Sequence, residues 1–208
     1  MSNRTLTDKA EAILARNHWV FDLDGTLTLP VHDFSVIRQA LGVPDGIDIL
    51  GYLASLPDPE AQPLHDKLTA IETELLERIA PAPGTVQLIE ALQRRGSRIG
   101  ILTRNTRDIA VRALDSLGLG GYFPEECILG RDDALPKPDP EGLFQLCAMW
   151  GTIPAEMVMV GDYVFDLQTG RNAGVATIHV DRTRRFLWPE LTDIGVSTPE
   201  ELLQMLPA

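Results

Sequence analysis

Short apolar runs alternate with longer amphipathic segments along most of the chain. The apolar runs have the length of buried strands, and the segments between them carry apolar residues at helical spacing. Strands are expected at residues 19–21, 98–102, 127–129, 157–160 and 176–180. Helices are expected at residues 6–16, 86–95, 108–117, 140–150, 165–173 and from 199 onward. Because the two kinds of segment alternate, the pattern predicts an α/β fold in which helices cover both faces of a parallel sheet.

Several helix ends are marked by residues that commonly cap helices. Gly96 and Gly118 follow amphipathic segments and are expected to end them. Asp139 precedes Pro140, the pattern of an N-cap followed by proline at the first helical position. The stretch from Thr198 to Glu201 has the spacing of a capping box, and it predicts the start of a closing helix.

Residues 30–81 interrupt this alternation. Apolar residues recur at helical spacing through the stretch, and prolines and glycines divide it into segments. A connection of this length is not a bare loop in a small protein, and Pro81-Ala82-Pro83-Gly84 marks the point of return. We therefore predict a helical insertion at 30–81, which forms a lid over a core made of 1–29 and 82–208. The alternative, further helices of the core itself, is disfavoured by that joint.

The charge of the chain narrows the set of partners. The 208 residues include 18 Lys and Arg against 30 Asp and Glu, a formal net charge of -12. Such a charge repels phosphate backbones and anionic lipid surfaces, so neither nucleic acid nor a membrane is an expected partner. Neither a signal peptide nor an apolar run of the roughly 20 residues that span a membrane is evident, which predicts a cytoplasmic protein. Cys127 and Cys147 lack metal-ligand spacing and are expected to be buried thiols.

The first expected strand ends abruptly in polar residues. Asp22 and Asp24 are two positions apart, so on an extended backbone both carboxylates face one side while Leu23 turns inward. Two acids so close need a cation between them or a shared proton. Gly25 and Thr26 add a permissive backbone position and a hydroxyl. An Asp-Gly hairpin turn is the alternative, but helical sequence rather than a returning strand follows.

Polar residues follow three other expected strands. They are Thr103-Arg104-Asn105, Lys137, and Gly161-Asp162 with Asp166 four residues on. Each alone is ordinary, as a helix cap, a solvated lysine or a turn. In a parallel sheet, however, the carboxyl ends of the strands meet at one edge, so these groups gather with Asp22 and Asp24. Together they supply acids, an anion-binding hydroxyl and a cation, which suits phosphoryl chemistry.

In chain order, these residues resemble the four motifs of the haloacid dehalogenase (HAD) superfamily of phosphotransferases. The matching residues are Asp22-Leu23-Asp24-Gly25-Thr26, Thr103, Lys137, and Gly161-Asp162 with Asp166. The position of the insertion, between the first and second motifs, is similar to that of the helical cap in phosphoglycolate-phosphatase-like members. The resemblance implies a Rossmann-like core with a small inserted α-helical cap.

The resemblance also implies roles for the matched residues. Asp22 would attack phosphorus and form an aspartyl-phosphate, a carboxylate nucleophile that divides one displacement into two. Asp24 would protonate the leaving oxygen and then deprotonate the attacking water. Thr103 and Lys137 would hold the phosphoryl oxygens. These roles describe a phosphatase that acts on a small phosphorylated metabolite.

A Mg²⁺ ion is the implied cofactor. The implied ligands are the Asp22 carboxylate, the Asp24 backbone carbonyl, Asp162, and Asp166 either directly or through a neighbouring group. A small hard cation prefers such oxygen ligands and would neutralise part of the phosphate charge.

Four further residues are candidates for contact with the substrate. Arg104 and Asn105 follow Thr103 directly and could meet a second anionic or hydroxylated group, or they could cap the helix that begins there. His32 and His65 lie in the insertion and are weaker candidates.

Three other functions remain open on the same fold. A carbon-halogen hydrolase does not need an acid two residues after the nucleophile, so Asp24 counts against it. A phosphomutase would need a cap that excludes water, for which this insertion is short. A non-catalytic phosphate-binding module is conceivable because a fold does not dictate function, although every catalytic position is intact. The sequence leaves the particular metabolite and the oligomeric state open.

Overall fold

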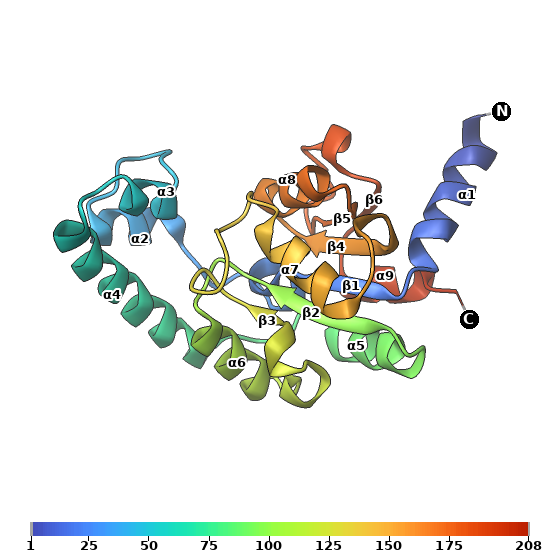
Figure 1. The fold of residues 1–208 in the computed structure, drawn as a ribbon, viewed down its shortest axis with the longest axis horizontal. Helices are drawn as coiled ribbons and strands as arrows, with labels where there is room; N and C mark the ends of the chain where they lie inside the picture. Colours follow the sequence, from blue (N-terminus) through green and yellow to red (C-terminus); the bar gives the residue numbers. More distant parts are fainter. Residues whose placement is uncertain (1, 208) are drawn as a thin grey trace.

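Six parallel strands form one sheet in the order β3-β2-β1-β4-β5-β6 (Figure 1). The structure is a computed structural model that describes the backbone of residues 2–207 and the side chains of residues 8–207. The strands are β1 (His18–Phe21), β2 (Arg98–Leu102), β3 (Ile128–Leu129), β4 (Met157–Gly161), β5 (Ala176–Val180) and β6 (Ile194–Val196). The predicted parallel α/β fold is confirmed.

Helices cover both faces of this sheet, as predicted. They are α1 (Ser2–Leu14), α5 (Thr85–Arg94), α6 (Arg107–Ser116), α7 (Glu141–Trp150), α8 (Val164–Ala173) and α9 (Pro199–Met205). Successive residues of β1 face opposite sides: Trp19 and Phe21 pack with α1, α5, α6 and α9, whereas Val20 packs with α7 and α8. All three are fully buried, and burying a large apolar side chain contributes roughly 1.5–3 kcal/mol.

The register of the central strands brings their ends to one level. Phe21 lies beside Ile101 of β2 and Val160 of β4. The pairing continues past the strand, because the Asp22 N–H donates to the Val160 carbonyl at 2.9 Å. Residues that follow β1, β2 and β4 therefore meet at the carboxyl edge of the sheet.

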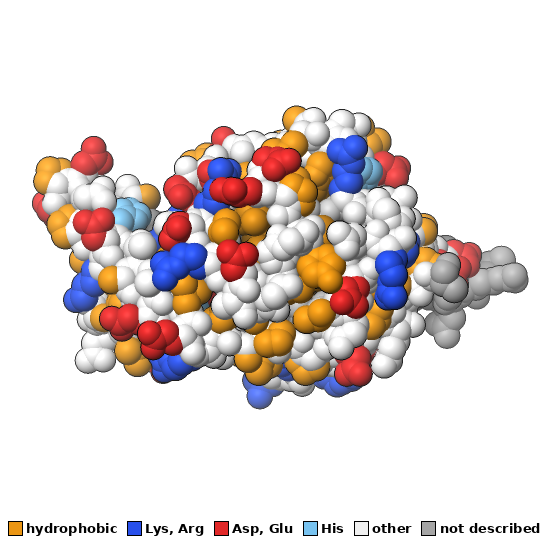
Figure 2. Space-filling view, turned by 90° about the horizontal axis from the view of Figure 1, so that it is seen from below, with side chains coloured by type: hydrophobic (Ala, Val, Ile, Leu, Met, Phe, Trp, Pro, Cys, Tyr) orange, Lys and Arg blue, Asp and Glu red, His pale blue; other side chains and the backbone are white. Residues whose placement is uncertain are grey.

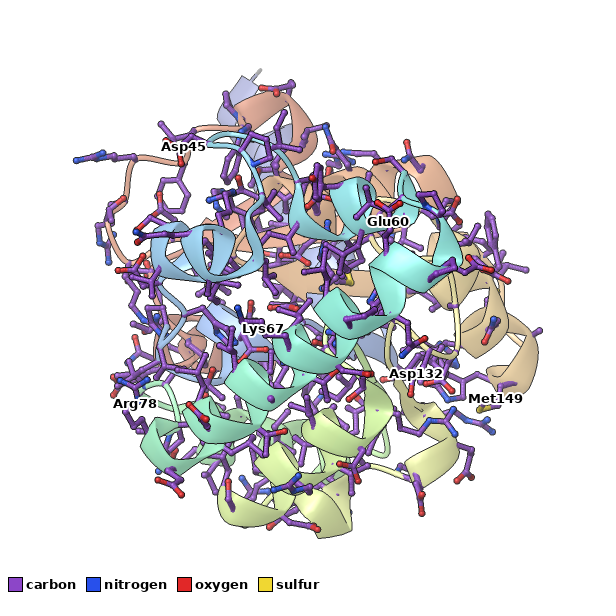
Figure 3. All side chains as sticks on the ribbon, turned by 90° about the vertical axis from the view of Figure 1, so that its left-hand side faces the viewer. Asp45, Glu60, Lys67, Arg78, Asp132 and Met149 are labelled. Atoms are coloured by element: carbon purple, nitrogen blue, oxygen red, sulfur yellow. The ribbon has the colours of Figure 1, made fainter. Side chains whose placement is uncertain are left out.

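The insertion forms three helices that lie beyond this edge (Figure 1). They are α2 (Phe34–Leu41), α3 (Ile49–Ala54) and α4 (Asp58–Leu75), followed by a short 3-10 helix, Leu76–Arg78. They share an apolar cluster that includes Ile37, Leu50, Leu53 and Leu68. Figure 3 shows α4, which carries Glu60 and Lys67, crossing in front of the core.

The two connections to the insertion run side by side. The Leu29 N–H donates to the Ala80 carbonyl at 2.8 Å, and the Ala82 N–H donates to the Leu27 carbonyl at 2.9 Å. Thr28 and Pro81 form an isolated antiparallel bridge between these bonds. The chain thus leaves the core and returns to it through one narrow neck.

Three local predictions need correction. β6 was not predicted, because Gly195 interrupts a run of only three residues. Asp139 is not the N-cap of α7: Pro140 takes that position, and the Asp139 carboxylate instead accepts the Glu141 N–H at 2.9 Å in a local turn. Only half of the capping box at α9 forms. Thr198 accepts the Glu201 N–H, but the Glu201 carboxylate accepts the N–H of Ser197 rather than that of Thr198.

The surface carries charges of both signs. In Figure 2, acidic and basic side chains are interspersed, and the described part of that face has no continuous basic patch. Within residues 2–207, none of the helices combines the length and the apolar character needed to cross a membrane.

Candidate active site

Asp22 lies at the carboxyl end of β1, where the chain turns sharply. The side chain is only 7% exposed, and Leu23 turns into the core as predicted. Gly25 has a φ of +85°, which favours glycine, and a Cβ there would lie 2.3 Å from Asp162 Oδ2. The turn therefore lets the backbone of the first motif approach the end of β4 closely. Thr26 Oγ1 donates to Asp22 Oδ2 at 3.2 Å.

Lys137 is fully buried between Asp22 and Asp166. Its Nζ donates to Asp22 Oδ1 at 2.6 Å, to Asp166 Oδ1 at 2.6 Å and to the Leu102 carbonyl at 2.7 Å. Burial disfavours the charge of Lys137, but the Asp166 and Asp22 carboxylates outweigh it and raise the pKa. All three ammonium protons are thus engaged, and the cation is fixed in position.

Three acids at this edge form a group that could hold a metal ion. One carboxylate oxygen each of Asp22, Asp162 and Asp166 lie within 4.8 Å of one another. Burial raises the pKa of Asp22 to about 7 and that of Asp162 to about 8, and repulsion among the acids adds to both shifts. Carboxylate oxygens are the ligands that hard divalent cations prefer, and such a cation would relieve this repulsion. The residues present therefore fit a divalent metal.

Asp166 differs from the other two acids because both of its oxygens already accept hydrogen bonds. Oδ1 accepts from Lys137, and Oδ2 accepts the Tyr163 N–H at 3.0 Å. Asp166 thus links the start of α8 to the buried lysine. This arrangement favours a role in positioning Lys137.

Asp24 faces a different part of the site. Its Oδ2 accepts a hydrogen bond from Asn105 Nδ2 at 2.6 Å, and His32 Nδ1 lies 3.7 Å from Oδ1. Burial raises the pKa of Asp24 to about 6, although Lys137 and Asn105 act in the opposite direction. Burial raises the pKa of Asp22 and Asp162 as well, but Asp22 is bonded to the Lys137 ammonium and Asp162 belongs to the group that could hold a metal, so Asp24 is the acid left to exchange a proton with a substrate.

The residues after β2 separate into distinct roles. Thr103 is 2% exposed, and its Oγ1 accepts the Asn105 N–H at 3.1 Å. Helix α6 is capped by Thr106, so the interpretation of Arg104 and Asn105 as helix caps is wrong. Arg104 donates to Asp48 of the insertion at 2.5 Å and to the Lys137 carbonyl at 2.7 Å. Its guanidinium also lies 4.3 Å from the ring centroid of Phe165, a cation-π contact.

A cavity of about 440 Å³ lies between the strand ends and the insertion. Every residue of the predicted site lines it: Asp22, Asp24, Thr103, Arg104, Asn105, Lys137, Asp162 and Asp166. Of the two weaker candidates, His32 lines the cavity and His65 does not. The opposite wall comes from the insertion and mixes apolar side chains, among them Phe34, Ile37, Leu50 and Leu68, with the polar or charged His32, Arg38, Asp48 and Glu72.

Sequence reasoning missed Glu72 and Arg131, which join the insertion to the core. Arg131 follows β3, and its Nη1 donates to Glu72 Oε1 at 2.9 Å. Both side chains are less than 9% exposed. The available signal was an acid on the apolar face of a helix, four residues after Leu68 and three before Leu75. For Arg131 the sequence offered none.

The chain matches the haloacid dehalogenase-like hydrolase family over residues 18–174. It is 32% identical over 199 residues to an uncharacterized hydrolase of Saccharomyces cerevisiae, covering 90% of this chain and 89% of that protein. It is 27% identical to the N-acetylmuramic acid 6-phosphate phosphatase of Pseudomonas aeruginosa, covering 90% and 93%. It is 29% identical to the phosphoglycolate phosphatase of Agrobacterium fabrum, covering 77% and 78%.

A solved structure of a hydrolase from Pseudomonas syringae superposes with a TM-score of 0.77 at 25% identity, covering 92% of this chain and 98% of that one. With the family match over most of the chain, this establishes that the protein belongs to the haloacid dehalogenase-like hydrolases. The predicted resemblance, including its likeness to phosphoglycolate phosphatases, is confirmed. The protein is accordingly an enzyme of the hydrolase class.

Proposed function

We propose that the protein hydrolyses a phosphomonoester of a small molecule in two steps, with Mg²⁺ as cofactor. The observation that carries the proposal is the contrast between two acids in one cavity. Burial raises the pKa of both, to about 7 for Asp22 and about 6 for Asp24. Asp22, however, accepts a hydrogen bond from the Lys137 ammonium at 2.6 Å, which favours its charged form, whereas Asp24 accepts one from the neutral Asn105 amide. One carboxylate is fixed as a nucleophile and the other can carry a proton, which is the division of labour that ester hydrolysis needs.

In the first step, a carboxylate oxygen of Asp22 attacks phosphorus and the bond to the ester oxygen breaks. Asp24 gives its proton to that oxygen, so the alcohol leaves neutral and Asp22 carries the phosphoryl group. In the second step, Asp24 takes a proton from water, whose oxygen attacks the same phosphorus and releases phosphate. Asp22 and Asp24 are then both restored, and atoms and protons balance.

Lys137, Thr103 and Asn105 support these steps. Lys137 favours the charged form of Asp22 and offsets its repulsion from the phosphate. Thr103 Oγ1 lies at the same edge and can donate to a phosphoryl oxygen. The Asn105 amide orients the Asp24 carboxylate through the bond at 2.6 Å.

Asp22, Asp162 and the backbone carbonyl of Asp24 would hold Mg²⁺, and Asp166 would support the site mainly through Lys137. The bound ion would neutralise part of the charge of the phosphoryl group. We further propose that residues 30–81 act as a cap on the core of 1–29 and 82–208. Their wall of the cavity closes the site against water.

Three observations support a phosphatase over the alternatives. Asp24 has no role in carbon-halogen hydrolysis, yet it is half-buried and oriented by the Asn105 amide here. Relatives that align over most of the chain are named phosphatases. The residues assigned to phosphoryl transfer also line one cavity, which a mere binding module would not require.

The test is phosphate release from a generic aryl phosphate, with Mg²⁺ and with EDTA. We expect release only with Mg²⁺, and we expect Asp22→Asn to lose essentially all of it because an amide is not a nucleophile here. The matched control is Asp108→Asn, an exposed acid on α6 whose side chain is 77% exposed. Release by Asp22→Asn at the rate of the control would disprove the assignment. Transfer of the phosphoryl group within the substrate, without release, would instead indicate a phosphomutase.

A further inference from the structure

Glu72 is an acid placed where the helix pattern calls for an apolar side chain. It lies on the buried face of α4 and is 6% exposed, and it lines the cavity on the side opposite the strand ends. Burial raises its pKa to about 7, Arg131 opposes this shift, and the charge of Asp24 adds to it. Glu72 and Asp24, the proton donor proposed above, line the same cavity, one from the insertion and one from the strand ends.

The two oxygens of Glu72 have different surroundings. Oε1 accepts a hydrogen bond from Arg131 Nη1 at 2.9 Å. Oε2 is equally buried but accepts no hydrogen bond from any described residue. A buried acceptor without a partner costs about 1–3 kcal/mol. Oε2 is covered by protein in this structure, so a donor from a ligand reaches it when the Glu72 side chain turns toward the cavity that the residue lines.

The hydrogen bonds of Arg131 determine which oxygen of Glu72 has no hydrogen-bond donor. Its Nη2 donates to Thr69 Oγ1 at 3.0 Å, and its Nη1 also donates to the Arg104 carbonyl at 3.0 Å. The guanidinium is thus held by both the insertion and the core. In this position the guanidinium donates to Oε1 of Glu72 and not to Oε2.

The basic side chains that line the cavity are already bonded to the protein. Lys137 is held by Asp22 and Asp166, and Arg104 by Asp48. Arg38 donates to the carbonyls of Ile47 and Phe34 within the insertion. A carboxylate placed against Glu72 would meet its negative charge, and Arg131, the cation beside Glu72, is bonded to Glu72, Thr69 and the Arg104 carbonyl.

We propose that Glu72 selects the substrate: its Oε2 accepts a hydrogen bond from a hydroxyl or amino group on the leaving group of the phosphate ester. The class of substrate is then a phosphorylated polyol or amino alcohol, and phosphorylated carboxylic acids are disfavoured. This inference rests on the proposed phosphatase function. The phosphoryl group lies at the strand ends, so the rest of the substrate extends toward α4. Apart from Glu72, the nearby wall includes the apolar Leu68 and Ile37.

A purely structural role, in which Glu72 only anchors Arg131, makes a different prediction for Glu72→Gln. Arg131 presents only donors, so the amide oxygen of the glutamine must face Arg131 and the amide NH₂ must face the cavity. The link and the shape are kept, but an acceptor is replaced by a donor. A structural role leaves substrate preference unchanged, whereas a selecting role weakens the preference for a hydroxyl and improves the acceptance of a carboxylate.

The experiment compares three small esters: glycerol 3-phosphate, n-propyl phosphate and phosphoglycolate. All three have a short carbon chain. Besides the phosphate, the first carries hydroxyls, the second carries no polar group and the third carries a carboxylate. Each is read as kcat/KM or, where turnover is slow, as the inhibition constant against an aryl phosphate. The matched control is Glu74→Gln, which makes the same charge change at an exposed position of the same helix.

At pH 8 or above, where Glu72 is mostly ionised, we expect the wild type to prefer glycerol 3-phosphate over n-propyl phosphate about tenfold to a hundredfold, the range for a hydrogen bond to a charged group. Glu72→Gln should reduce that preference to a few-fold, because a hydroxyl bonds a neutral amide more weakly than a carboxylate. It should raise phosphoglycolate relative to n-propyl phosphate at least about tenfold. Glu74→Gln should behave as the wild type. A thermal melt of each variant shows that it is folded, and the wild-type ranking tests the proposal without any variant.

Three results would overturn the inference while leaving the phosphatase function intact. They are a wild type that prefers phosphoglycolate to n-propyl phosphate, ratios in Glu72→Gln equal to those of the wild type, and equal shifts in Glu74→Gln. Failure of the proposed function looks different, because no phosphate is then released even from the aryl ester.

Discussion

The two walls of the cavity are built in different ways. On the strand-end wall, side-chain bonds join groups from different segments: Lys137 bonds Asp22 and Asp166, and Asn105 bonds Asp24. Their positions follow from strands whose register brings their ends to one level. On the insertion wall, the side chains come from helices that pack mainly on one another around their own apolar cluster.

This difference indicates where each wall can change. The positions of the paired charges on the strand-end wall are strongly constrained. Moving one of them away leaves its partner buried and unpaired, which is strongly unfavourable. The insertion is joined to the core by the neck. Two ion pairs also connect them, Glu72 with Arg131 and Asp48 with Arg104. The chemistry is therefore fixed by the sheet, and selectivity can be altered through the helices without moving it.

The largest effect that would sharpen the comparison concerns Asp24 on the strand-end wall. In Asp24→Asn the leaving oxygen receives no proton, so we expect kcat/KM for an alkyl phosphate to fall by about 10²–10⁴. An aryl phosphate, whose leaving group needs no proton, should lose much less in the first step. Hydrolysis of the phosphorylated Asp22 should then be slow, and the intermediate should accumulate.

We would measure kcat/KM for an alkyl phosphate and for an aryl phosphate in the wild type and in Asp24→Asn. The acyl-phosphate on Asp22 would be trapped in the same proteins. Asp108→Asn again serves as the control for loss of one acid outside the cavity. Equal losses for both esters would contradict the role of Asp24 as proton donor.

The strand-end wall is also the part of the site that the sequence predicted. Asp22, Thr103, Lys137 and Asp162 directly follow or lie near expected strands, and topology alone brings such ends together. Local spacing also placed Leu23 inward and assigned the turn to Gly25, whose φ is +85°. When the reactive residues follow the strands of a parallel sheet, their order in the sequence predicts most of their arrangement in space.

The insertion wall was not predictable in the same way. Helical spacing predicted that 30–81 forms helices, but not which faces meet the core. The pairing of Glu72 with Arg131 joins residues 59 positions apart on two packed segments. Likewise, the pairing of Arg104 with Asp48 could not be predicted, because the sequence of α3 does not show where the Asp48 carboxylate lies relative to the core. Such contacts follow from tertiary packing and not from local pattern.

A second prediction concerns the charge cluster on the strand-end wall. Mg²⁺ at about a hundredfold excess over its Kd should stabilise the wild type by about 2.7 kcal/mol, which raises the melting temperature by roughly 5–10 °C. Asp162→Asn removes a proposed ligand and should gain much less from Mg²⁺. An undiminished gain in the variant would remove Asp162 from the metal site.

The same melts in EDTA carry a pH dependence. The pKa of Asp162 is raised to about 8, so the folded state holds a proton that the unfolded state releases at lower pH. Stability without metal should therefore fall as pH rises between about 4 and 8. Asp162→Asn lacks this loss, so it should melt no lower than the wild type at pH 5 and higher at pH 8. A variant that melts lower at pH 8 would contradict repulsion within the cluster.

The smallest expected effect tests how the insertion wall is attached. Asp48 caps α3 through the Gly51 N–H at 2.9 Å and pairs with Arg104 through its other oxygen. Asparagine is also a good N-cap, so Asp48→Asn keeps the helix start and weakens only the ion pair. The two side chains are 21% and 39% exposed, and pairs of this kind contribute about 0.2–1 kcal/mol. We expect KM to rise no more than about fivefold, because the closed arrangement is less populated, while kcat stays within about twofold. Asp45→Asn, at an exposed position of the same insertion, is the matched control for loss of charge (Figure 3). A fall in kcat of tenfold or more would show that this ion pair also positions the strand-end wall, and the separation of the two walls would then fail.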